Sequence, residues 1–376
     1  MRVLFIARYR DVTMDRKVHY LARTNGLVVR HIRPAAWRDD LLTVTPAAVS
    51  DSVDQVSLGM LGRPADPHRA LYRTLGFGLA QFRPDIIHAE EEPDSLTALQ
   101  IAIARRLFAP KARLILNTWQ NIDRPRRAQV RWVTRQTLRA ASAVMCANRE
   151  AQTILGRHGY SGYTRVLPAV GVDTEVFRPC PPRSPGGPLV VGYTGRLVYE
   201  KGLGTLLVAI AELGAGCELQ LIGGGPDRAA LEAQARALGV EGRVHFMPPV
   251  PPAQVAQHLC QLDVFVLPSI TTRVWKEQFG RALTEAMACG VPVVGSSSGA
   301  IPEVIGAAGL IVPEGDPLAL ANCLRRLQES PELRRDLAAK GEARVREFYT
   351  QAVIARETVD VYRRLLSEPA GANPQS

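Results

Sequence analysis

Short apolar runs alternate with longer amphipathic stretches along the first half of the chain. The run RVLFIA (residues 2–7) is apolar at every position after Arg2, which is typical of a strand buried on both faces of a sheet. The same pattern predicts further strands at 27–33, 85–89, 113–118, 142–147 and 164–169, and helices at 14–24, 68–82, 94–107, 126–140 and 149–158. Strands and helices alternating at this spacing indicate a parallel sheet with helices on both faces.

The same alternation begins again after RPCPPRSPGGP, a segment too rich in proline and glycine to form a helix or a strand. The sequence therefore predicts an α/β protein with two doubly wound, Rossmann-like domains that face each other across a cleft. Ligands of such sheets bind beyond the carboxyl ends of the strands. The predicted parts are an N-terminal domain at 1–177, a linker at 178–188, a C-terminal domain at 189–347, a C-terminal helix at 348–367 and a tail at 368–376.

The composition fits a soluble globular protein, with 46% hydrophobic and 22% charged residues among 376. No apolar run is long enough to predict a membrane-spanning helix, and the N-terminus lacks the cleavage site of a secretory signal. The six cysteines are scattered without a C-x-x-C pair, which argues against a disulfide framework and a zinc site. We therefore expect a cytoplasmic protein whose cysteines are small buried hydrophobes.

Positive charge is concentrated in the first half of the chain. Residues 1–180 carry 27 Lys and Arg against 16 Asp and Glu, whereas the remainder carries 19 against 20. This asymmetry predicts that one domain faces a polyanion or an anionic membrane surface, unless the arginines only decorate a solvated surface. The stretch 124–139, RPRRAQVRWVTRQTLR, is the best candidate for such a surface, because it is a basic helix that also carries Trp132 and Val133.

Two glycine-containing loops of the second half follow predicted strands. GYTGRLVYEKG (192–202) supplies Gly195, Arg196 and Lys201, so backbone N–H groups and two cations can bind a diphosphate, although a solvated basic turn is the alternative. LIGGGPDRAALEAQA (221–235) supplies Gly223 and Gly224 in a second strand–glycine–helix junction. The next strand there lacks the acidic residue of a dinucleotide fingerprint, which excludes a dehydrogenase.

The stretch WKEQFGRALTEAMACG (275–290) is predicted to be helical and carries two carboxylates. Glu285 lies among apolar residues, and a carboxylate near a core needs a partner, such as the hydroxyls of a ribose. Glu277 precedes the helix and lies beside Gln278, Phe279 and Gly280, where free backbone N–H groups gather. Two solvated glutamates on one helix face are the alternative interpretation.

These motifs together resemble a known family. The pattern E-x7-E followed by ACGVPVV resembles the signature of the family 4 retaining glycosyltransferases, which have the GT-B fold. GYTGRLVYEKG resembles the donor loop of that family, and DVFVLPS, SGAIPEVIG, GLIVPEGD and GVDTEVFRP also stand at the expected places. The resemblance covers nearly all of the second half, and it extends to the first half through the order of elements and DIIHAEEEP.

The resemblance implies transfer of a sugar from a nucleoside-diphosphate sugar, with retention of anomeric configuration, no cofactor and no required metal. It implies that Arg196 and Lys201 hold the diphosphate, that Glu285 binds the ribose, and that Glu277 contacts the donor sugar with help from amides near Phe279. It also implies that the C-terminal helix crosses back to the first domain. The sequence has no Asp-x-Asp motif, which agrees with a metal-independent enzyme.

Two features of the first half depart from the family pattern and concern the acceptor. The first loop reads ARYRDVTMDRK, with no glycine pair; its Arg8, Tyr9 and Arg10 become candidate acceptor residues. Relatives often carry His-x-His at the strand end where this chain has His88 followed by Glu90, so Glu90 is predicted to take a catalytic role. His88 is predicted either to bind the acceptor or to be a satisfied strand-end histidine.

The loop after the strand at 113–118 contributes the last acceptor candidates, Trp119, Gln120 and Asn121. The acceptor is expected to be a glycan, a lipid-linked sugar or a small molecule in cell-envelope polysaccharide or glycoconjugate biosynthesis, with the inner face of the membrane as a further location. One alternative is a GT-B enzyme that epimerises or hydrolyses a nucleotide sugar. A nucleic-acid-binding protein is a weaker alternative, because no recognition motif accompanies the basic charge.

Overall fold

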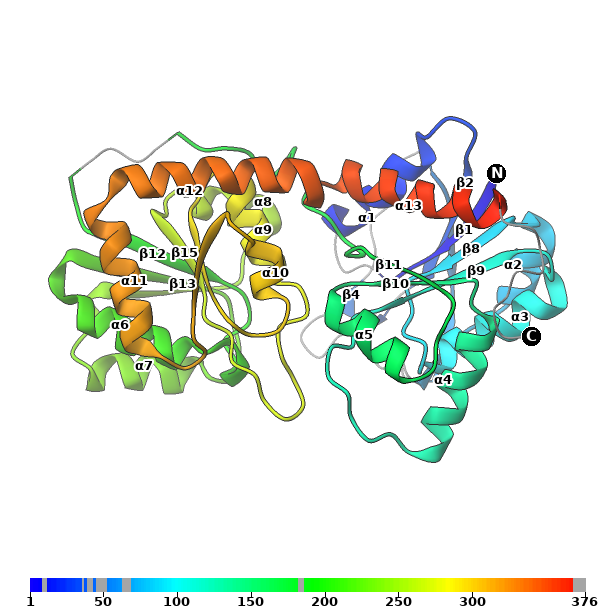
Figure 1. The fold of residues 1–376 in the computed structure, drawn as a ribbon, viewed down its shortest axis with the longest axis horizontal. Coiled ribbons are helices and arrows are strands. Elements are labelled where there is room, and N and C mark those ends of the chain that lie inside the picture. The colour runs from blue at the N-terminus through cyan, green and yellow to red at the C-terminus, as the bar shows by residue number, and fades with distance from the viewer. Residues whose placement is uncertain are drawn as a thin grey trace. The chain divides into compact units, whose positions relative to one another are not determined.

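The computed structural model describes residues 1–8, 12–35, 37–38, 43–44, 53–62, 69–181 and 186–367. The chain forms two compact units (Figure 1). Unit 1 comprises Met1–Gly171 together with Gln351–Ser376, and unit 2 comprises Val172–Thr350. Each unit is built around one parallel sheet, which confirms the predicted α/β class with two Rossmann-like parts.

The sheet of unit 1 has seven parallel strands in the order β11-β10-β9-β8-β1-β2-β5. Strand β1 pairs with β2 on one side and with β8 on the other, so the order of strands reverses there. The bounds are β1 (Arg2–Ile6), β2 (Val28–Pro34), β5 (Asp54–Leu58), β8 (Ile86–Ala89), β9 (Arg113–Thr118), β10 (Ala143–Cys146) and β11 (Tyr163–Val166).

Two helical layers cover this sheet because the apolar residues of its strands alternate between the two faces. Leu4 and Ile6 pack with one set of helices, whereas Val3 and Phe5 pack with the other. The first set is α2 (Leu75–Phe82), α3 (Leu96–Phe108), α4 (Ala128–Ala140) and α5 (Arg149–Arg157). The second set is α1 (Val12–Ala22) and α13 (Gln351–Ser367), which lie side by side (Figure 1).

Two short antiparallel pairs, β3 (Trp37–Arg38) with β4 (Thr43–Val44) and β6 (Met60–Gly62) with β7 (Ala70–Tyr72), complete unit 1. The helix predicted at 68–82 is therefore wrong in its first part, where the chain forms β7. Thr74, with φ of 57°, then separates β7 from α2 in a conformation that interrupts a right-handed helix.

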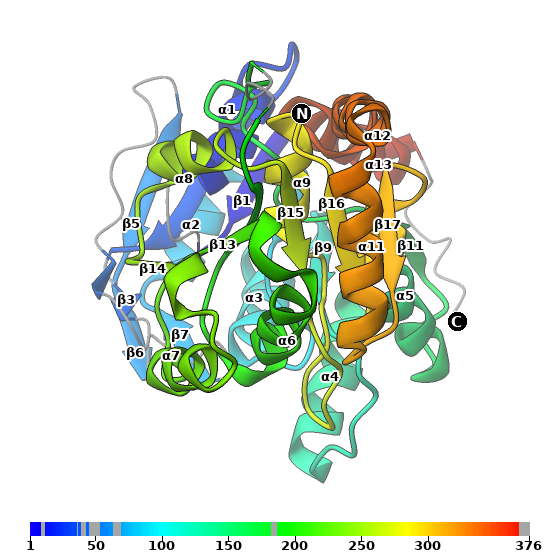
Figure 2. The ribbon, with the colours of Figure 1, turned by 90° about the vertical axis from the view of Figure 1, so that its left-hand side faces the viewer.

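The sheet of unit 2 has six parallel strands in the order β14-β13-β12-β15-β16-β17. Helices α6, α7 and α11 form one layer and stand in a row in Figure 2, while α8, α9, α10 and α12 contact one another in the other layer. The strands are β12 (Leu189–Thr194), β13 (Cys217–Ile222), β14 (Val244–Met247), β15 (Val264–Leu267), β16 (Val293–Ser296) and β17 (Gly309–Val312). The helices are α6 (Leu203–Leu213), α7 (Arg228–Ala237), α8 (Pro252–Leu259), α9 (Arg281–Ala288), α10 (Ile301–Ile305), α11 (Pro317–Glu329) and α12 (Pro331–Arg344).

The end of the chain returns to unit 1, as the sequence predicts. A π-helical turn at Val345–Tyr349 follows α12, and α13 then packs on the first sheet. Ile354, Val359 and Tyr362 of α13 are buried in the same core cluster as Phe5. None of the described helices combines the length and the apolar character that crossing a bilayer requires.

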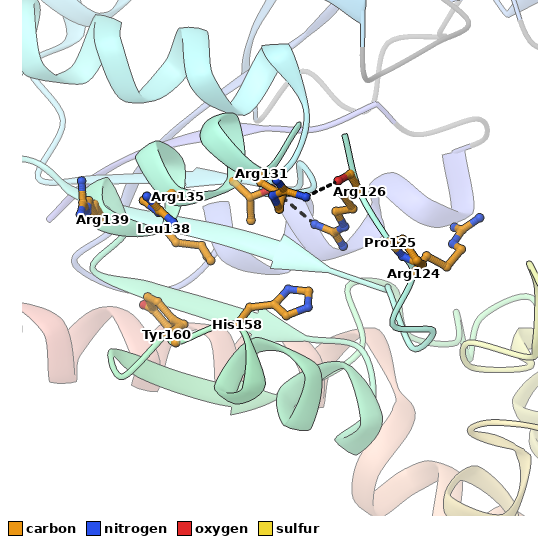
Figure 3. A pocket seen from close by; sticks show the side chains of 11 residues that line it. Arg124, Pro125, Arg126, Arg131, Arg135, Leu138, Arg139, His158 and Tyr160 are labelled. Atoms are coloured by element: carbon orange, nitrogen blue, oxygen red, sulfur yellow. Dashed lines mark hydrogen bonds between the residues drawn. The ribbon is translucent and has the colours of Figure 1, made fainter. Parts of the chain in front are cut away.

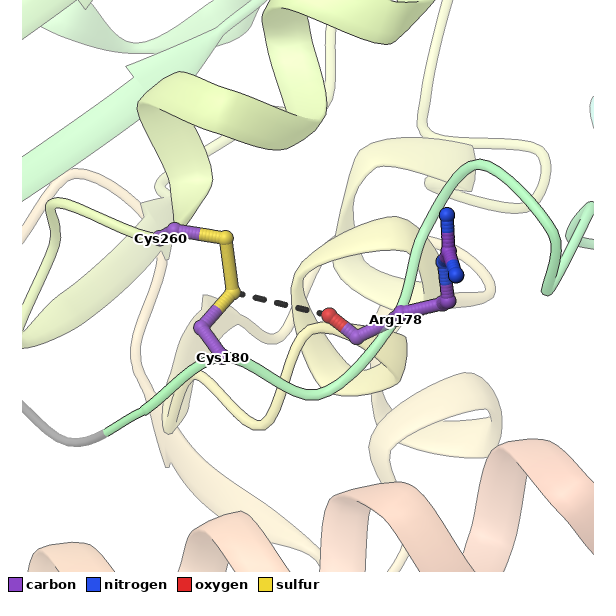
Figure 4. The surroundings of a disulfide bond; sticks show 3 residues. All are labelled: Arg178, Cys180 and Cys260. Atoms are coloured by element: carbon purple, nitrogen blue, oxygen red, sulfur yellow. Dashed lines mark hydrogen bonds between the residues drawn. A yellow bond between two sulfur atoms is a disulfide. The ribbon is translucent and has the colours of Figure 1, made fainter.

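The expectation that the cysteines form no disulfide is wrong for one pair. Cys180 and Cys260 are joined, with their Cα atoms 5.4 Å apart, although 80 residues separate them in sequence (Figure 4). The fold brings the segment after Val172 against the end of α8, which no local spacing of cysteines could reveal. Cys289 completes a group of three whose sulfur atoms all lie within 4.8 Å of one another. Burial raises the pKa of the Cys289 thiol to about 12, so this third cysteine is a protonated thiol at neutral pH.

Candidate functional site

The carboxyl ends of β12 and β13 in unit 2 are joined backbone to backbone. Gly195 N–H donates to the carbonyl of Ile222, and Leu197 N–H donates to that of Gly224. Gly223 has φ of 145°, and a Cβ added there would lie 1.9 Å from the carbonyl oxygen of Gly195. The two predicted glycine loops therefore form one surface lined by main chain, which permits the close approach of an anion.

Lys201 and Arg196 lie in this loop but differ in their surroundings. Lys201 ends a 3₁₀ turn, Tyr199–Lys201, and its Nζ lies 2.6 Å from Glu277 Oε2 and 4.7 Å from the centre of the Trp275 ring. The Arg196 side chain is half exposed, and its guanidinium lies 3.8 Å from Glu200 in a weak pair. Arg196 is thus free to reorient toward a ligand, whereas Lys201 is held in place.

Glu277 is buried and anchored by the loops that follow two other strands. Its Oε2 accepts a hydrogen bond from Ser269 Oγ at 2.9 Å in addition to that from Lys201. Its backbone carbonyl accepts from Ala300 N–H, beyond the end of β16. A buried carboxylate with both an ammonium and a hydroxyl as partners is compensated and fixed in direction. The structure therefore brings together Lys201 and Glu277, which are 76 residues apart.

Within the stretch 275–290 the helix α9 begins at Arg281, so Glu277 precedes the helix as the sequence predicts. Gly280 precedes it with φ of 79°, a left-handed conformation that favours glycine. Phe279 is buried and meets the Tyr349 ring edge-on at 5.6 Å, while Gln278 is partly buried. The residues 277–280 therefore form an ordered loop whose backbone lies at the start of α9.

Glu285 has a partner within the chain that the sequence interpretation did not name. It is only 8% exposed, and its Oε1 lies 3.0 Å from Nε of Arg281, one helical turn earlier. The Arg281 side chain is about one third exposed, so this pair has access to solvent on one side. The i, i+4 spacing of an acid and an arginine was a signal available in the sequence.

In unit 1 the loop after β8 carries three consecutive acids, each bound to a different element. Glu90 Oε1 lies 2.8 Å from Nζ of Lys17 on α1, and both side chains are buried. Glu91 forms a bidentate pair with Arg8, whose Nε donates at 2.9 Å. Glu92 accepts from the hydroxyl of Thr118 and from the backbone N–H that follows it. These contacts bring Arg8 and Glu90 to the same strand-end region; Tyr9 and Arg10 lie outside the described residues.

Lys17 is a residue that the sequence interpretation missed. It is fully buried, and it lies next to Val18 and four residues before Leu21, both buried on the same side of α1. A lysine on the apolar face of a predicted helix was the available signal, because a buried ammonium requires an acidic partner.

His88 is fully buried and connects β8 with two other elements. Its Nδ1 lies 2.6 Å from the hydroxyl of Tyr362, and its Nε2 lies 3.0 Å from Oδ1 of Asn117. Burial holds the pKa of His88 well below its ordinary value, and the nearby Lys17 adds repulsion. The neutral ring therefore donates from Nε2 to the amide oxygen and accepts at Nδ1 from the tyrosine. Both ring nitrogens of His88 therefore have hydrogen-bond partners within the chain, as expected of a structural histidine at a strand end.

The three residues after β9 are held in a hydrogen-bonded loop. Gln120 Nε2 donates to Asp94 at 2.9 Å, and Gln120 Oε1 accepts from Arg126. Trp119 is partly buried against the core beneath α13, and Asn121 is buried. The loop is therefore ordered by polar contacts within unit 1.

Comparisons with known proteins agree with this geometry. Residues 180–344 match the family described as Glycosyl transferases group 1, which confirms the resemblance carried by the motifs of the second half. The chain is 35% identical over 225 residues to the D-inositol 3-phosphate glycosyltransferase of a Nocardioides species, covering 53% of this chain and 48% of that protein. It is 34% identical over 206 residues to the putative colanic acid biosynthesis glycosyltransferase WcaL of Escherichia coli, covering 52% of this chain and 50% of that protein.

The fold comparison extends further than the sequence comparison. The chain spans about half the length of these two curated relatives. A solved structure of Anabaena Alr3699/HepE in complex with UDP, in contrast, superposes over 97% of this chain and all of that one, with a TM-score of 0.73 and 19% identity. The two-unit GT-B architecture is therefore shown for both halves of the chain.

Proposed function

We propose, from the membership of residues 180–344 in the group 1 glycosyl transferases, that the chain is a retaining, metal-independent glycosyltransferase that uses a nucleoside-diphosphate sugar. The observation that carries this proposal is the Lys201–Glu277 pair at the glycine-lined strand ends of unit 2. This pair places an ammonium and a carboxylate of fixed position beside backbone that an anion can approach. The ammonium suits the phosphate of a sugar donor, and the carboxylate suits its sugar hydroxyls.

The phosphate end of the donor is assigned to the loop after β12. Gly195, Gly223 and Gly224 add no side chains at its approach, although the N–H groups of Gly195 and Gly223 donate to carbonyls of the chain. Lys201 contributes a point charge, and Arg196 contributes a planar fork. Negative charge grows on the leaving diphosphate as the glycosidic bond breaks. Cations that are fixed before the reaction stabilise that charge without reorganisation, which is usually the largest catalytic contribution.

The sugar and ribose are assigned to the segment around α9. Glu277 accepts hydrogen bonds from sugar hydroxyls, with the amides of Gln278, Phe279 and Gly280 beside it. Glu285 accepts from the ribose hydroxyls, and its pairing with Arg281 orients the carboxylate in the absence of the donor. Both carboxylates are held by cations of the chain, so neither depends on the donor to be stable in its buried position.

The acceptor side is assigned to the loops of unit 1. Arg8, Glu90, Trp119, Gln120 and Asn121 lie in the loops after β1, β8 and β9, with Tyr9 and Arg10 as further candidates. Glu90 offers a polar group in the place of the second His of relatives. His88 holds this strand end in position through its hydrogen bonds to Tyr362 and Asn117. The acceptor is a glycan, a lipid-linked sugar or a small molecule of cell-envelope polysaccharide or glycoconjugate biosynthesis, as the name of WcaL suggests for that relative.

The proposed location is the cytoplasm, at the inner face of the membrane. The excess of positive charge in residues 1–180 supports this assignment, because anionic lipid headgroups attract such a surface.

Incubation with UDP-, GDP- and ADP-sugars, with and without an acceptor mixture, tests the assignment. We expect one donor to be consumed only when acceptor is present, without added metal and in the presence of a chelator. The anomeric proton coupling of the product, measured by NMR, should match that of the donor. Product from the donor alone would instead identify an epimerase or a hydrolase, and an inverted product would contradict retention.

A further inference from the structure

A cavity of about 500 Å³ lies in unit 1 between α4 and the end of α5 (Figure 3). Arg131, Arg135 and Leu138 of α4 lie on one side of it, and His158 and Tyr160 lie on the other (Figure 3). The lining residues are Arg124, Pro125, Arg126, Arg131, Thr134, Arg135, Leu138, Arg139, His158, Gly159 and Tyr160, and we call this cavity the arginine pocket.

The positive charge of the arginine pocket is only partly compensated by the chain. Arg126 lies 3.5 Å from the carboxylate of Asp94, and Arg131 Nη1 donates to the backbone carbonyl of Arg126 at 2.9 Å. Across the described parts of the chain, Arg124, Arg135 and Arg139 form no ion pair. Several guanidinium groups around one cavity therefore repel one another in the absence of a bound anion.

The spacing along α4 makes this repulsion stronger. Arg131, Arg135 and Arg139 are four residues apart, and like charges at that spacing destabilise a helix. Val133 and Thr137, on another side of the same helix, are buried in unit 1, so α4 cannot rotate to move the three arginines away from the pocket. An anion in the pocket would offset the repulsion at all three positions.

We propose that the arginine pocket binds a phosphate or diphosphate group of a ligand other than the sugar donor. A guanidinium presents paired N–H groups that match phosphate oxygens, and several arginines around one cavity permit more than one such contact. The volume exceeds that of a phosphate group, so the pocket also holds part of the molecule that carries it, against Leu138 and Tyr160. That molecule is either a phosphate-bearing soluble compound or an anionic lipid.

Isothermal titration of inorganic pyrophosphate tests the pocket directly. Arg135→Gln/Arg139→Gln should bind pyrophosphate at the pocket about a hundredfold more weakly than wild type, since each charge-assisted contact contributes about a factor of ten. The matched control is Arg127→Gln/Arg157→Gln, which removes two exposed arginines from the same two-helix region without touching the pocket lining. Equal binding by the two double variants would overturn the proposal.

Lys201→Ala keeps this proposal separate from the donor assignment. This variant should lose pyrophosphate binding at unit 2 only. Pyrophosphate binding at the arginine pocket should still be seen in the titration. If Lys201→Ala abolishes all pyrophosphate binding, the pocket proposal fails while the donor assignment stands.

Flotation with vesicles identifies the source of the phosphate. Vesicles of phosphatidylglycerol and phosphatidylcholine, against phosphatidylcholine alone, should recover wild type and the control but lose Arg135→Gln/Arg139→Gln if the ligand is a lipid. Pyrophosphate binding without vesicle binding would assign the pocket to a soluble phosphate-bearing ligand. A circular dichroism melt of each variant confirms that the fold is retained.

Discussion

The strand-end loops of the two units are ordered in opposite ways. In unit 2 the loops touch through glycine backbone, and a side chain at Gly223 would collide with the carbonyl of Gly195. In unit 1 the acids after β8 are each bound to a side chain from another element, as Glu90 is to Lys17. The first arrangement places glycine backbone at the strand ends, whereas the second places paired charges there. A bare backbone suits a phosphate that is common to many donors, and paired charges suit an acceptor that differs from enzyme to enzyme.

The largest expected effect follows from removing the cation of the unit 2 loops, Lys201. Lys201→Ala should lower kcat/KM by about a hundred- to a thousandfold, because one preorganised charge is removed from the leaving diphosphate. Lys340→Ala is the matched control, since this exposed lysine of α12 pairs with Asp336 one turn away and is not part of the strand-end loops. Steady-state kinetics on both variants measure the difference. Similar kcat/KM values for the two would show that the donor phosphate is not bound here.

The next largest effect follows from removing one of the paired charges of unit 1, and it should lower the free energy of unfolding. Lys17→Met leaves Glu90 buried without its ammonium, so the free energy of unfolding should fall by about 3–5 kcal/mol. Urea denaturation measures this change, with Lys111→Met as an exposed control. Adding Glu90→Gln to Lys17→Met should recover part of the loss, because the unpaired charge is then gone. A Lys17→Met protein as stable as wild type would contradict the pairing.

A third prediction concerns the covalent link of unit 2, for which unit 1 has no counterpart among its described residues. Reduction of Cys180–Cys260 should lower the free energy of unfolding of unit 2 by about 2–4 kcal/mol, since the bond closes a long loop in the unfolded chain. Denaturation with and without a reductant measures the loss. Cys180→Ser/Cys260→Ser should show the lower stability in both conditions. A reductant effect that persists in this double variant would assign the loss to other cysteines.

The smallest expected effect of a single side chain is the sensitivity of each buried histidine of unit 1 to acid. Burial lowers the pKa of His88 well below that of an unfolded histidine and lowers that of His31 to about 3. The unfolded chain therefore binds more protons below about pH 6.5, and stability is lost as the pH falls below that value. Each such histidine contributes about 1.4 kcal/mol per pH unit. Hydrogen exchange of α13 and β8 at pH 7 and pH 5 measures the loss, and His88→Gln should reduce it.

The parts of the site that sequence could predict are those built from neighbouring residues. Gly195, Arg196 and Lys201 lie within one loop, and their spacing alone indicates an anion site. The same locality explains most of the fold, because each uniformly apolar run became a strand of one of the two sheets. The start of α9 after Glu277 is also a local feature, because Gly280 precedes the helix in a left-handed conformation that favours glycine.

The parts that sequence could not predict depend on contacts between distant residues. The Cys180–Cys260 bond spans 80 positions, and the partner of His88 lies 274 positions away on α13. The prediction of a helix over 68–82 was wrong in its first part for a different reason. Residues 70–72 have the composition of a helix, but pairing with β6 decides their conformation.

The return of α13 to unit 1 has a consequence for biosynthesis on the ribosome. Residues 172–350 emerge before Tyr362, whose side chain closes the core around His88 and Phe5. Unit 2 can therefore complete its fold while unit 1 still lacks a buried helix. At ordinary rates of translation this delay lasts roughly 10 to 40 seconds. During that interval the apolar face that α13 will cover on the nascent first unit is exposed, which makes it a natural binding surface for chaperones.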